Sequence, residues 1–307
     1  MTPPGPPGGG RLLVPLYVHP AADPAAWAAL AGAAPRLRGV VLNAADGPGQ
    51  RPDPAFGAAA DRLRAAGVPL LGYVDTGYGR RAPRAVVADI RRHRRWYSVD
   101  GVFLDQVPVT AAPLPHYRRL VLLAKALGAG TAVLNPGTHP HPGYARIADL
   151  LVTFEGDWET YRRAAIPPWT ADHPPARFCH LVYGVPPGGA AHVARTADGR
   201  GAGVHCAVPG EGTNPWRSLP YLNEDPSRPG GLGPGKGDAG DEPVAGRPVP
   251  GESWRGAGDG VLPADGGPHG PALSSGRASS HGWGPFRRGA PSFRARTCAE
   301  PLPGRAR

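Results

Sequence analysis

The sequence predicts an α/β protein, folded as a compact (β/α)8 barrel of the TIM type. Four short apolar runs have near-continuous hydrophobic residues, many of them β-branched, without the alternation of a half-exposed strand. Such runs are typical of buried parallel strands. Strand and helix signals alternate from about residue 12 to residue 208, and eight strands can be counted, which is the number that closes a barrel. The four runs are residues 70–75, 101–106, 132–135 and 150–155.

Each element follows from local signals along the chain. Strands are expected at residues 12–19, 39–43, 68–74, 101–105, 131–135, 150–154, 177–183 and 203–208. Helices are expected at about residues 24–30, 54–66, 83–96, 114–127, 143–147, 158–164 and 188–196. Asp23 is a suitable N-cap before Pro24, and Gly67 is a suitable C′ glycine after the second helix. A doubly wound open sheet is the alternative, but no Gly-rich phosphate loop follows the first strand.

The composition divides the chain into three parts. The 46 Gly and 41 Pro residues concentrate in the first ten residues and after residue 222. We expect a disordered N-terminal segment at 1–10, the barrel at 11–222 and a disordered Gly/Pro/Arg-rich tail at 223–307, because the tail has too little apolar surface to offset its ordering entropy. The tail also resembles GC-rich DNA translated in a shifted frame. The basic residues are nearly all Arg, which is typical of a high-GC bacterial genome.

The formal net charge of +10 does not by itself indicate a nucleic-acid partner. The arginines are scattered, the one dense run (Arg91, Arg92, Arg94 and Arg95) falls on an expected helix face, and no nucleic-acid-binding motif accompanies it. No stretch is long and apolar enough to span a membrane, and the N-terminus has no signal-peptide pattern. We therefore expect a cytoplasmic monomer as the sequence is written, or a secreted one if the start site is wrongly assigned.

No metal or other cofactor is expected. The three cysteines, Cys179, Cys206 and Cys298, are odd in number and widely spaced, which gives neither a disulfide framework nor a metal motif. Cys179 and Cys206 are expected to be buried in successive strands, and a bridge between them is an alternative if those strands are neighbours. His139 and His141 share a loop without a nearby third ligand, which makes a poor metal site.

The four apolar runs share a second feature, because each ends on a carboxylate or a carboxamide. These ends converge on one mouth of a barrel, and hydrolysis of a glycosidic bond needs two carboxyl groups facing one site. We expect Asp105 as nucleophile or charge stabiliser and Glu155 as general acid. The acid would need a raised pKa, supplied by an apolar wall such as Phe103, Phe154 or Tyr183. The alternative is that one carboxylate only pairs with an arginine such as Arg80.

Six further residues are candidates for substrate binding, and each has a structural alternative. Asp75 could contact substrate or cap its own loop. Three tyrosines could stack on sugar rings or fill the core, and two carboxamides could bond sugar hydroxyls or stabilise loops. Trp216 is more readily interpreted as a packing residue that closes the barrel. The tyrosines are Tyr17, Tyr73 and Tyr78, and the carboxamides are Gln106 and Asn135.

Seven motifs in order resemble the spherulation-specific family 4 (spherulin-4) proteins over about residues 12–222. They are VPLYV at 14–18, GYVDTGYG at 72–79, VDGVFLD at 99–105, LNPGT at 134–138, TFEG at 153–156, LVYG at 181–184 and NPW at 214–216. The resemblance implies a (β/α)8 barrel related to glycoside hydrolases that cleave galactosaminogalactan-type polysaccharide internally at N-acetylgalactosamine.

The resemblance also exposes one departure. In the relatives the fourth strand usually ends Asp-Glu, and a glutamate on the sixth strand completes an acidic trio. Asp105 and Glu155 match two of these residues, but Gln106 stands where the middle glutamate is expected. A carboxamide cannot exchange a proton at a useful pKa. Two hypotheses follow: a glycoside hydrolase acting on a polysaccharide that contains N-acetylgalactosamine or galactosamine, or a non-catalytic carbohydrate-binding barrel.

Overall fold

A computed structural model describes residues 11–222 of the chain, and the expectations for residues 1–10 and 223–307, including Cys298, fall outside this range. Eight parallel strands close into a barrel in sequence order, with β1 also paired to β8. This confirms the predicted fold class. The strands are β1 (Leu12–Pro15), β2 (Leu37–Leu42), β3 (Leu70–Asp75), β4 (Gly101–Asp105), β5 (Thr131–Leu134), β6 (Leu150–Asp157), β7 (Phe178–Tyr183) and β8 (Val204–Ala207).

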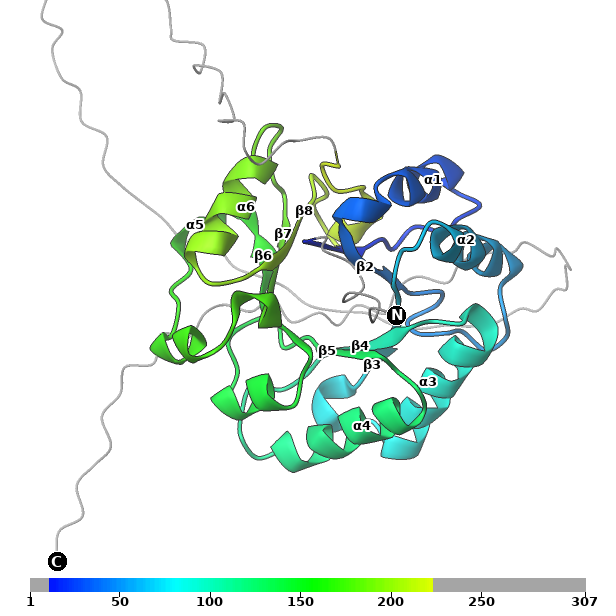
Figure 1. Ribbon diagram of the computed structural model, residues 1–307, viewed down its shortest axis with the longest axis horizontal. Helices are drawn as coiled ribbons and strands as arrows, with labels where there is room; N and C mark the ends of the chain where they lie inside the picture. The colour runs from blue at the N-terminus through cyan, green and yellow to red at the C-terminus, as the bar shows by residue number, and fades with distance from the viewer. Residues whose placement is uncertain (1–10, 223–307) are drawn as a thin grey trace, which may run out of the picture. The chain divides into compact units, whose positions relative to one another are not determined.

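Six α-helices of the described region surround the strands (Figure 1): α1 (Pro24–Gly32), α2 (Pro54–Ala65), α3 (Pro83–Tyr97), α4 (Leu114–Ala126), α5 (Trp158–Arg163) and α6 (Ala190–Gly199). The Asp23 side chain caps α1 by accepting the N–H of Ala26 at 2.9 Å, and Gly67 follows α2 with φ 79°, both as the sequence predicts. The expected helix at 143–147 is instead a 3₁₀ turn, Pro142–Arg146, so β5 and β6 are joined without an α-helix.

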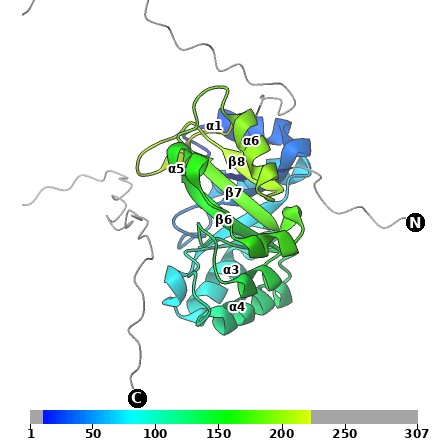
Figure 2. The same ribbon diagram turned by 90° about the vertical axis from the view of Figure 1, so that its left-hand side faces the viewer.

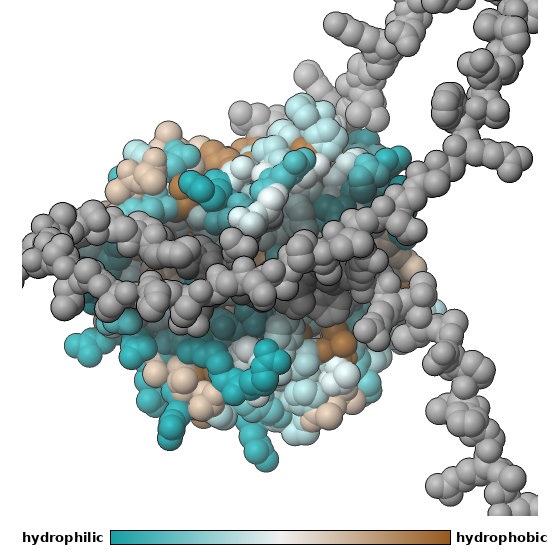
Figure 3. All heavy atoms as spheres, turned by 180° about the vertical axis from the view of Figure 1, so that it is seen from behind, coloured by the Kyte–Doolittle hydropathy of each residue, from teal (hydrophilic) through white to brown (hydrophobic). Residues whose placement is uncertain are grey.

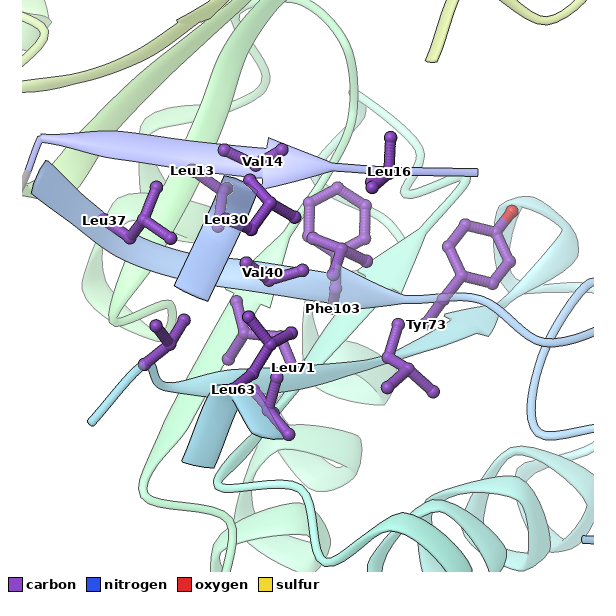
Figure 4. Packing of buried hydrophobic residues seen from close by; sticks show 14 of the residues in the cluster. Leu13, Val14, Leu16, Leu30, Leu37, Val40, Leu63, Leu71, Tyr73 and Phe103 are labelled. Atoms are coloured by element: carbon purple, nitrogen blue, oxygen red, sulfur yellow. The ribbon is translucent and has the colours of Figure 1, made fainter. Parts of the chain in front are cut away.

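The core fills the barrel and the layer between strands and helices. Leu30 of α1 and Leu63 of α2 pack against the strands, and Tyr73 lies near their carboxyl ends (Figure 4). Cys179 and Cys206 are fully buried on the neighbouring strands β7 and β8, and both are free thiols. The alternative of a bridge between them is therefore wrong. As buried thiols in an apolar interior they behave as small hydrophobic residues.

An irregularity in β6 decides which way Glu155 points. The register between β6 and β7 shifts between Val152 and Phe154, which marks a β-bulge. Val152 packs in the same cluster as Cys179 inside the barrel, whereas Phe154 packs outside against Tyr161 of α5. With regular alternation from Val152, Phe154 would point inward and Glu155 outward. The bulge adds one residue and returns Glu155 to the interior.

The surface is mostly hydrophilic where it can be seen, with hydrophobic residues in small separate groups (Figure 3). On α3, Arg92 forms an ion pair with Asp89 at 3.0 Å and Arg94 donates to the carbonyl of Gly128, while Arg91 and Arg95 are exposed. Across residues 11–222, no helix has the length and apolar character to cross a membrane. The helices α5 and α6 lie along the outer side of the strands β6–β8 (Figure 2).

Candidate active site

Three neighbouring strands bring two carboxylates and one carboxamide together at the mouth of the barrel. Asp105 ends β4, Asn135 follows β5 directly, and Glu155 lies near the end of β6. The amide nitrogen of Asn135 donates to Asp105 Oδ1 at 2.7 Å and to Glu155 Oε2 at 2.6 Å. Asn135 Oδ1 accepts the N–H of Gly137 at 3.0 Å, which fixes the orientation of the amide. The two acids therefore face each other across a single amide group.

Each carboxylate has a further donor of its own. The hydroxyl of Tyr73 donates to Asp105 Oδ2 at 2.7 Å, and the indole N–H of Trp216 donates to Glu155 Oε1 at 3.1 Å. Tyr17 packs its ring edge against Tyr73, with the ring centroids 5.7 Å apart. Three side chains thus hold the pair through four hydrogen bonds, and the two bonds from Asn135 keep the nearest oxygens of the two carboxylates in a narrow range of separations.

The electrostatics of the pair favour a proton on it at neutral pH. Neither Asp105 nor Glu155 forms an ion pair with any basic side chain among residues 11–222, so the expected alternative of a pairing with Arg80 does not occur. Burial and then the charge of Asp105 raise the pKa of Glu155 to about 7. Burial also raises the pKa of Asp105, against the effect of its donors Tyr73 and Asn135. Two close carboxylates cannot both ionise easily.

The loop after β4 has an unusual backbone. Gln106 has φ 53° and Tyr78 in the β3 loop has φ 56°, so both adopt the left-handed conformation that non-glycine residues rarely occupy. The Tyr78 N–H donates to the Gln106 carbonyl at 2.8 Å, and the Thr76 hydroxyl donates to the same carbonyl at 2.9 Å. These bonds join the two loops beside Asp105. Strained residues held in this way gather at functional sites.

The side chains of the remaining candidates lie around the same mouth and form no hydrogen bond with the two carboxylates, although the backbone of Gln106 bonds Asp105. The Asp75 carboxylate accepts the N–H of Gly77 at 2.6 Å, which is the loop-capping arrangement. Tyr78 is 37% exposed, and the guanidinium of Arg80 lies over its ring at 5.6 Å. The side chain of Gln106 is partly exposed and forms no hydrogen bond to the described part of the chain. Substrate contact by these residues stays a prediction.

Two expectations about the site need correction. Phe154 cannot form the apolar wall of Glu155, because the bulge turns it to the outer side, where it meets Tyr161 and His180. Trp216 does more than close the barrel, since its N–H bonds Glu155 directly. The signal for Trp216 was present in the sequence as a tryptophan in the NPW motif after the last strand, but its hydrogen-bonding partner could not be read from that motif.

A large cavity lies away from this cluster. This cavity, of about 810 Å³, is lined by the end of α1 and by residues 219–222. Because α1 leads into β2, this cavity lies near the start of that strand, whereas barrel enzymes use the opposite end. The carboxylates instead lie partly exposed at the mouth. Within residues 11–222, no group of three or more His, Cys, Asp or Glu side chains could hold a metal ion.

Fold and site together define a glycoside hydrolase-like (β/α)8 barrel with an acidic pair at its mouth. The profile of spherulation-specific family 4 matches residues 11–214, and the chain belongs to that family. It is 39% identical to spherulin-4 of Physarum polycephalum over 152 residues. That match covers 47% of this chain and 44% of the relative, so less than half of the relative's length is matched.

A solved structure extends the comparison to the whole barrel. It is the crystal structure of Aspergillus clavatus Sph3 in complex with GalNAc, which is 27% identical to this chain with a TM-score of 0.61. The similarity covers 68% of this chain and 92% of the Sph3 chain. The likeness therefore includes nearly all of a protein that binds N-acetylgalactosamine.

Proposed function

We propose that this protein is an endo-acting glycoside hydrolase for a polysaccharide that contains N-acetylgalactosamine. Glu155 is the general acid and Asp105 is the nucleophile or charge stabiliser. The observation that carries the proposal is the acidic pair bridged by Asn135 at 2.7 Å and 2.6 Å. The similarity to Sph3, which was crystallised with GalNAc, supports the choice of sugar.

The pKa of Glu155 suits the role of an acid. A general acid works best when its pKa lies near the operating pH, because it must hold a proton and still release it. Burial and the nearby charge of Asp105 raise the pKa of Glu155 to about 7. Asp105 receives the Tyr73 hydroxyl and the Asn135 amide, which favour its anionic form. The pair can therefore hold one proton, mainly on Glu155, and one negative charge, mainly on Asp105.

The close approach of the nearest oxygens of the pair supports the proposal of a retaining mechanism. Asp105 Oδ1 and Glu155 Oε2 accept from the same nitrogen of Asn135, at 2.7 Å and 2.6 Å, so the distance between the two oxygens cannot exceed the sum of these two lengths. Carboxyl groups about 5–5.5 Å apart permit attack on the anomeric carbon by the second carboxylate, whereas about 6.5–9.5 Å is needed to admit a water. In this account Asp105 forms a covalent bond to the sugar while Glu155 protonates the leaving oxygen. Water then releases the sugar, with Glu155 as base.

A second candidate is a carbohydrate-binding barrel without catalysis. It is favoured by Gln106, which keeps the left-handed backbone of this loop but offers a carboxamide with no bond to the described residues. If the chemistry needs a carboxylate at this position, Asp105 and Glu155 bind sugar hydroxyls and no bond is broken.

The decisive experiment measures reducing ends released from a purified polymer of N-acetylgalactosamine. We expect release by the wild type and a loss of about 10²–10⁴-fold on Glu155→Gln or Asp105→Asn. The matched controls are Glu159→Gln and Asp61→Asn, whose side chains are 59% and 76% exposed and which should keep wild-type rates. Equal rates for the wild type and Asp105→Asn would overturn the assignment. No release by the wild type, with release by Gln106→Glu, would establish the binding barrel instead.

A further inference from the structure

A second cavity, of about 210 Å³, lies outside the barrel wall, behind the strand that carries Glu155. It is enclosed by the outer faces of β6 and β7, by α5 and by the segment that follows α5. It exists because α5 has only six residues, too few to cover both strands, and because the β6 bulge disturbs the packing there. The polar side chains on its wall are Thr138, His139, Thr153, Thr160, Tyr161, His180 and Arg200.

Two side chains on the wall of this cavity carry a polar atom that has no hydrogen-bond partner in residues 11–222. His180 is 1% exposed, and its Nδ1 is 3.0 Å from the Tyr161 hydroxyl. Its Nε2 has no hydrogen-bond partner in residues 11–222, and neither does the hydroxyl of Thr153, which is also 1% exposed. Both atoms are open to the cavity, so a molecule bound there can form hydrogen bonds with them.

The charge of the cavity wall indicates that a bound molecule carries a negative charge. Arg200 contributes a guanidinium, fixed by a 2.6 Å bond to the Tyr161 carbonyl and lying 4.8 Å over the Tyr161 ring. The wall has no aspartate or glutamate. Burial and then Arg200 lower the pKa of His139 to about 4, and burial and then His139 lower the pKa of His180 to about 3. Neutral imidazoles beside a guanidinium leave one positive charge without a counter-ion within the wall.

The rest of the wall is apolar. Phe154, Ala164, Ala165 and Ile166 contribute no polar side-chain atom to it. A fully hydrated ion would leave this surface in contact with water, whereas an alkyl chain would cover it and remove apolar surface from water.

We propose that this cavity binds a small carboxylate with a short apolar chain. Its carboxylate accepts hydrogen bonds from His180, Thr153 and Arg200, and its chain packs against Phe154 and Ile166. An arginine with accompanying neutral donors suits a planar carboxylate, and the volume of about 210 Å³ limits the chain to a few carbons. The site is separate from the acidic pair and does not depend on the proposed hydrolase activity.

The test is a titration of the full chain with sodium butyrate, followed by thermal unfolding and by the imidazole signals of His180 in NMR. Because a ligand that binds only the folded state stabilises it, we expect the melting temperature to rise with butyrate concentration. Thr153→Val keeps the side-chain volume and removes the hydroxyl, and His180→Phe removes the unpaired nitrogen. Each should weaken butyrate binding by about tenfold or more. Arg163→Gln, an arginine that is 81% exposed, is the matched control.

Butanol and inorganic phosphate test the chemical class. The proposal requires butyrate to stabilise the protein more than butanol, which shares the chain without the charge, and more than phosphate, which shares the charge without the chain. An equal effect of butanol, a stronger effect of phosphate, or an effect of butyrate that Thr153→Val and His180→Phe both leave intact would each overturn it. Absence of any butyrate effect on the wild type would do the same.

Discussion

Trp216 donates its indole N–H to Glu155 across 3.1 Å, which joins β6 to a segment 61 residues further along the chain. The same segment is tied to the start of the barrel, because the N–H of Tyr17 donates to the Trp216 carbonyl at 2.8 Å. The segment after β8 therefore helps to hold the carboxylate that we propose as the acid.

Trp216→Phe should move the pH profile of hydrolysis without removing activity. The indole bond lowers the pKa of Glu155, so its loss should raise that pKa by about 0.5–1 unit. Because a general acid must be protonated, the alkaline limb of kcat/KM should shift upward by the same amount. Trp169→Phe, which leaves the carboxylates untouched, is the control. An unchanged alkaline limb in Trp216→Phe would show that the hydrogen bond from Trp216 does not lower the pKa of Glu155.

Asn135→Ala should weaken catalysis more than binding. The amide is shared by both carboxylates, so its loss leaves the two acids without their common donor and free to move apart. We expect kcat to fall by about 10–10²-fold with a smaller change in KM. Asn43→Ala is the control, since the Asn43 side chain accepts the N–H of Gly47 in another loop. A change confined to KM would assign Asn135 to sugar binding alone.

Glu155→Gln should stabilise the protein at alkaline pH. The pKa of Glu155 rises from 4.5 to about 7 on folding, so between these values the native state keeps a proton that the unfolded state has lost. The unfolding free energy therefore falls as the pH rises through this window, and the fall persists above it. Because the side chain is partly exposed, we expect the variant to gain about 1–3 kcal/mol near pH 8 and little near pH 5.

Denaturant unfolding of both proteins at the two pH values measures this effect. Glu159→Gln should show no such pH dependence, because its side chain is 59% exposed and pairs with Arg162. If Glu155→Gln proves equally stable or less stable than the wild type near pH 8, the ionised Glu155 carboxylate does not destabilise the native state. The raised pKa of Glu155 would then be wrong.

Gly72→Ala should be strongly destabilising because of one close contact behind the site. A Cβ at Gly72 would lie 2.5 Å from Cγ of His93, which is fully buried and bonded through Nε2 to the Tyr73 carbonyl at 2.7 Å. We expect a loss of about 2–4 kcal/mol in unfolding free energy. His93→Ala also destabilises, but the double variant should lose less than the sum of the two, because the clash is gone. Strict additivity would contradict this.

The bounds of the strands agree with the sequence prediction where local apolar runs set them, and differ where distant contacts do. The bounds of β4 agree with the prediction because its apolar run ends cleanly at Asp105. The first strand stops at Pro15 instead of residue 19, since the chain beyond it pairs with the segment around Trp216. A contact of such sequence separation leaves no local pattern. The prediction of an α-helix at 143–147 was wrong, because the hydrogen bonds after Pro142 follow the tighter 3₁₀ spacing.

The residues of the site could be predicted from the sequence, but the hydrogen bonds and the bulge that arrange them could not. Polar residues at strand ends identified Asp105, Asn135 and Glu155, because parallel strands in a barrel end at one mouth. The bulge before Phe154 could not be predicted, since it depends on packing between β6, β7 and α5. The shared amide of Asn135 likewise depends on side-chain directions across three strands.

The most direct test of the account is an NMR titration of the Glu155 carboxyl carbon in the wild type and in Asp105→Asn. We predict a pKa of about 7 for Glu155 in the wild type. In Asp105→Asn the pKa should be lower, because the neighbouring charge that opposes ionisation has been removed. A Glu155 pKa near 4.5 that Asp105→Asn leaves unchanged would mean that the two acids do not share a proton. The assignment of Glu155 as the general acid would then be contradicted.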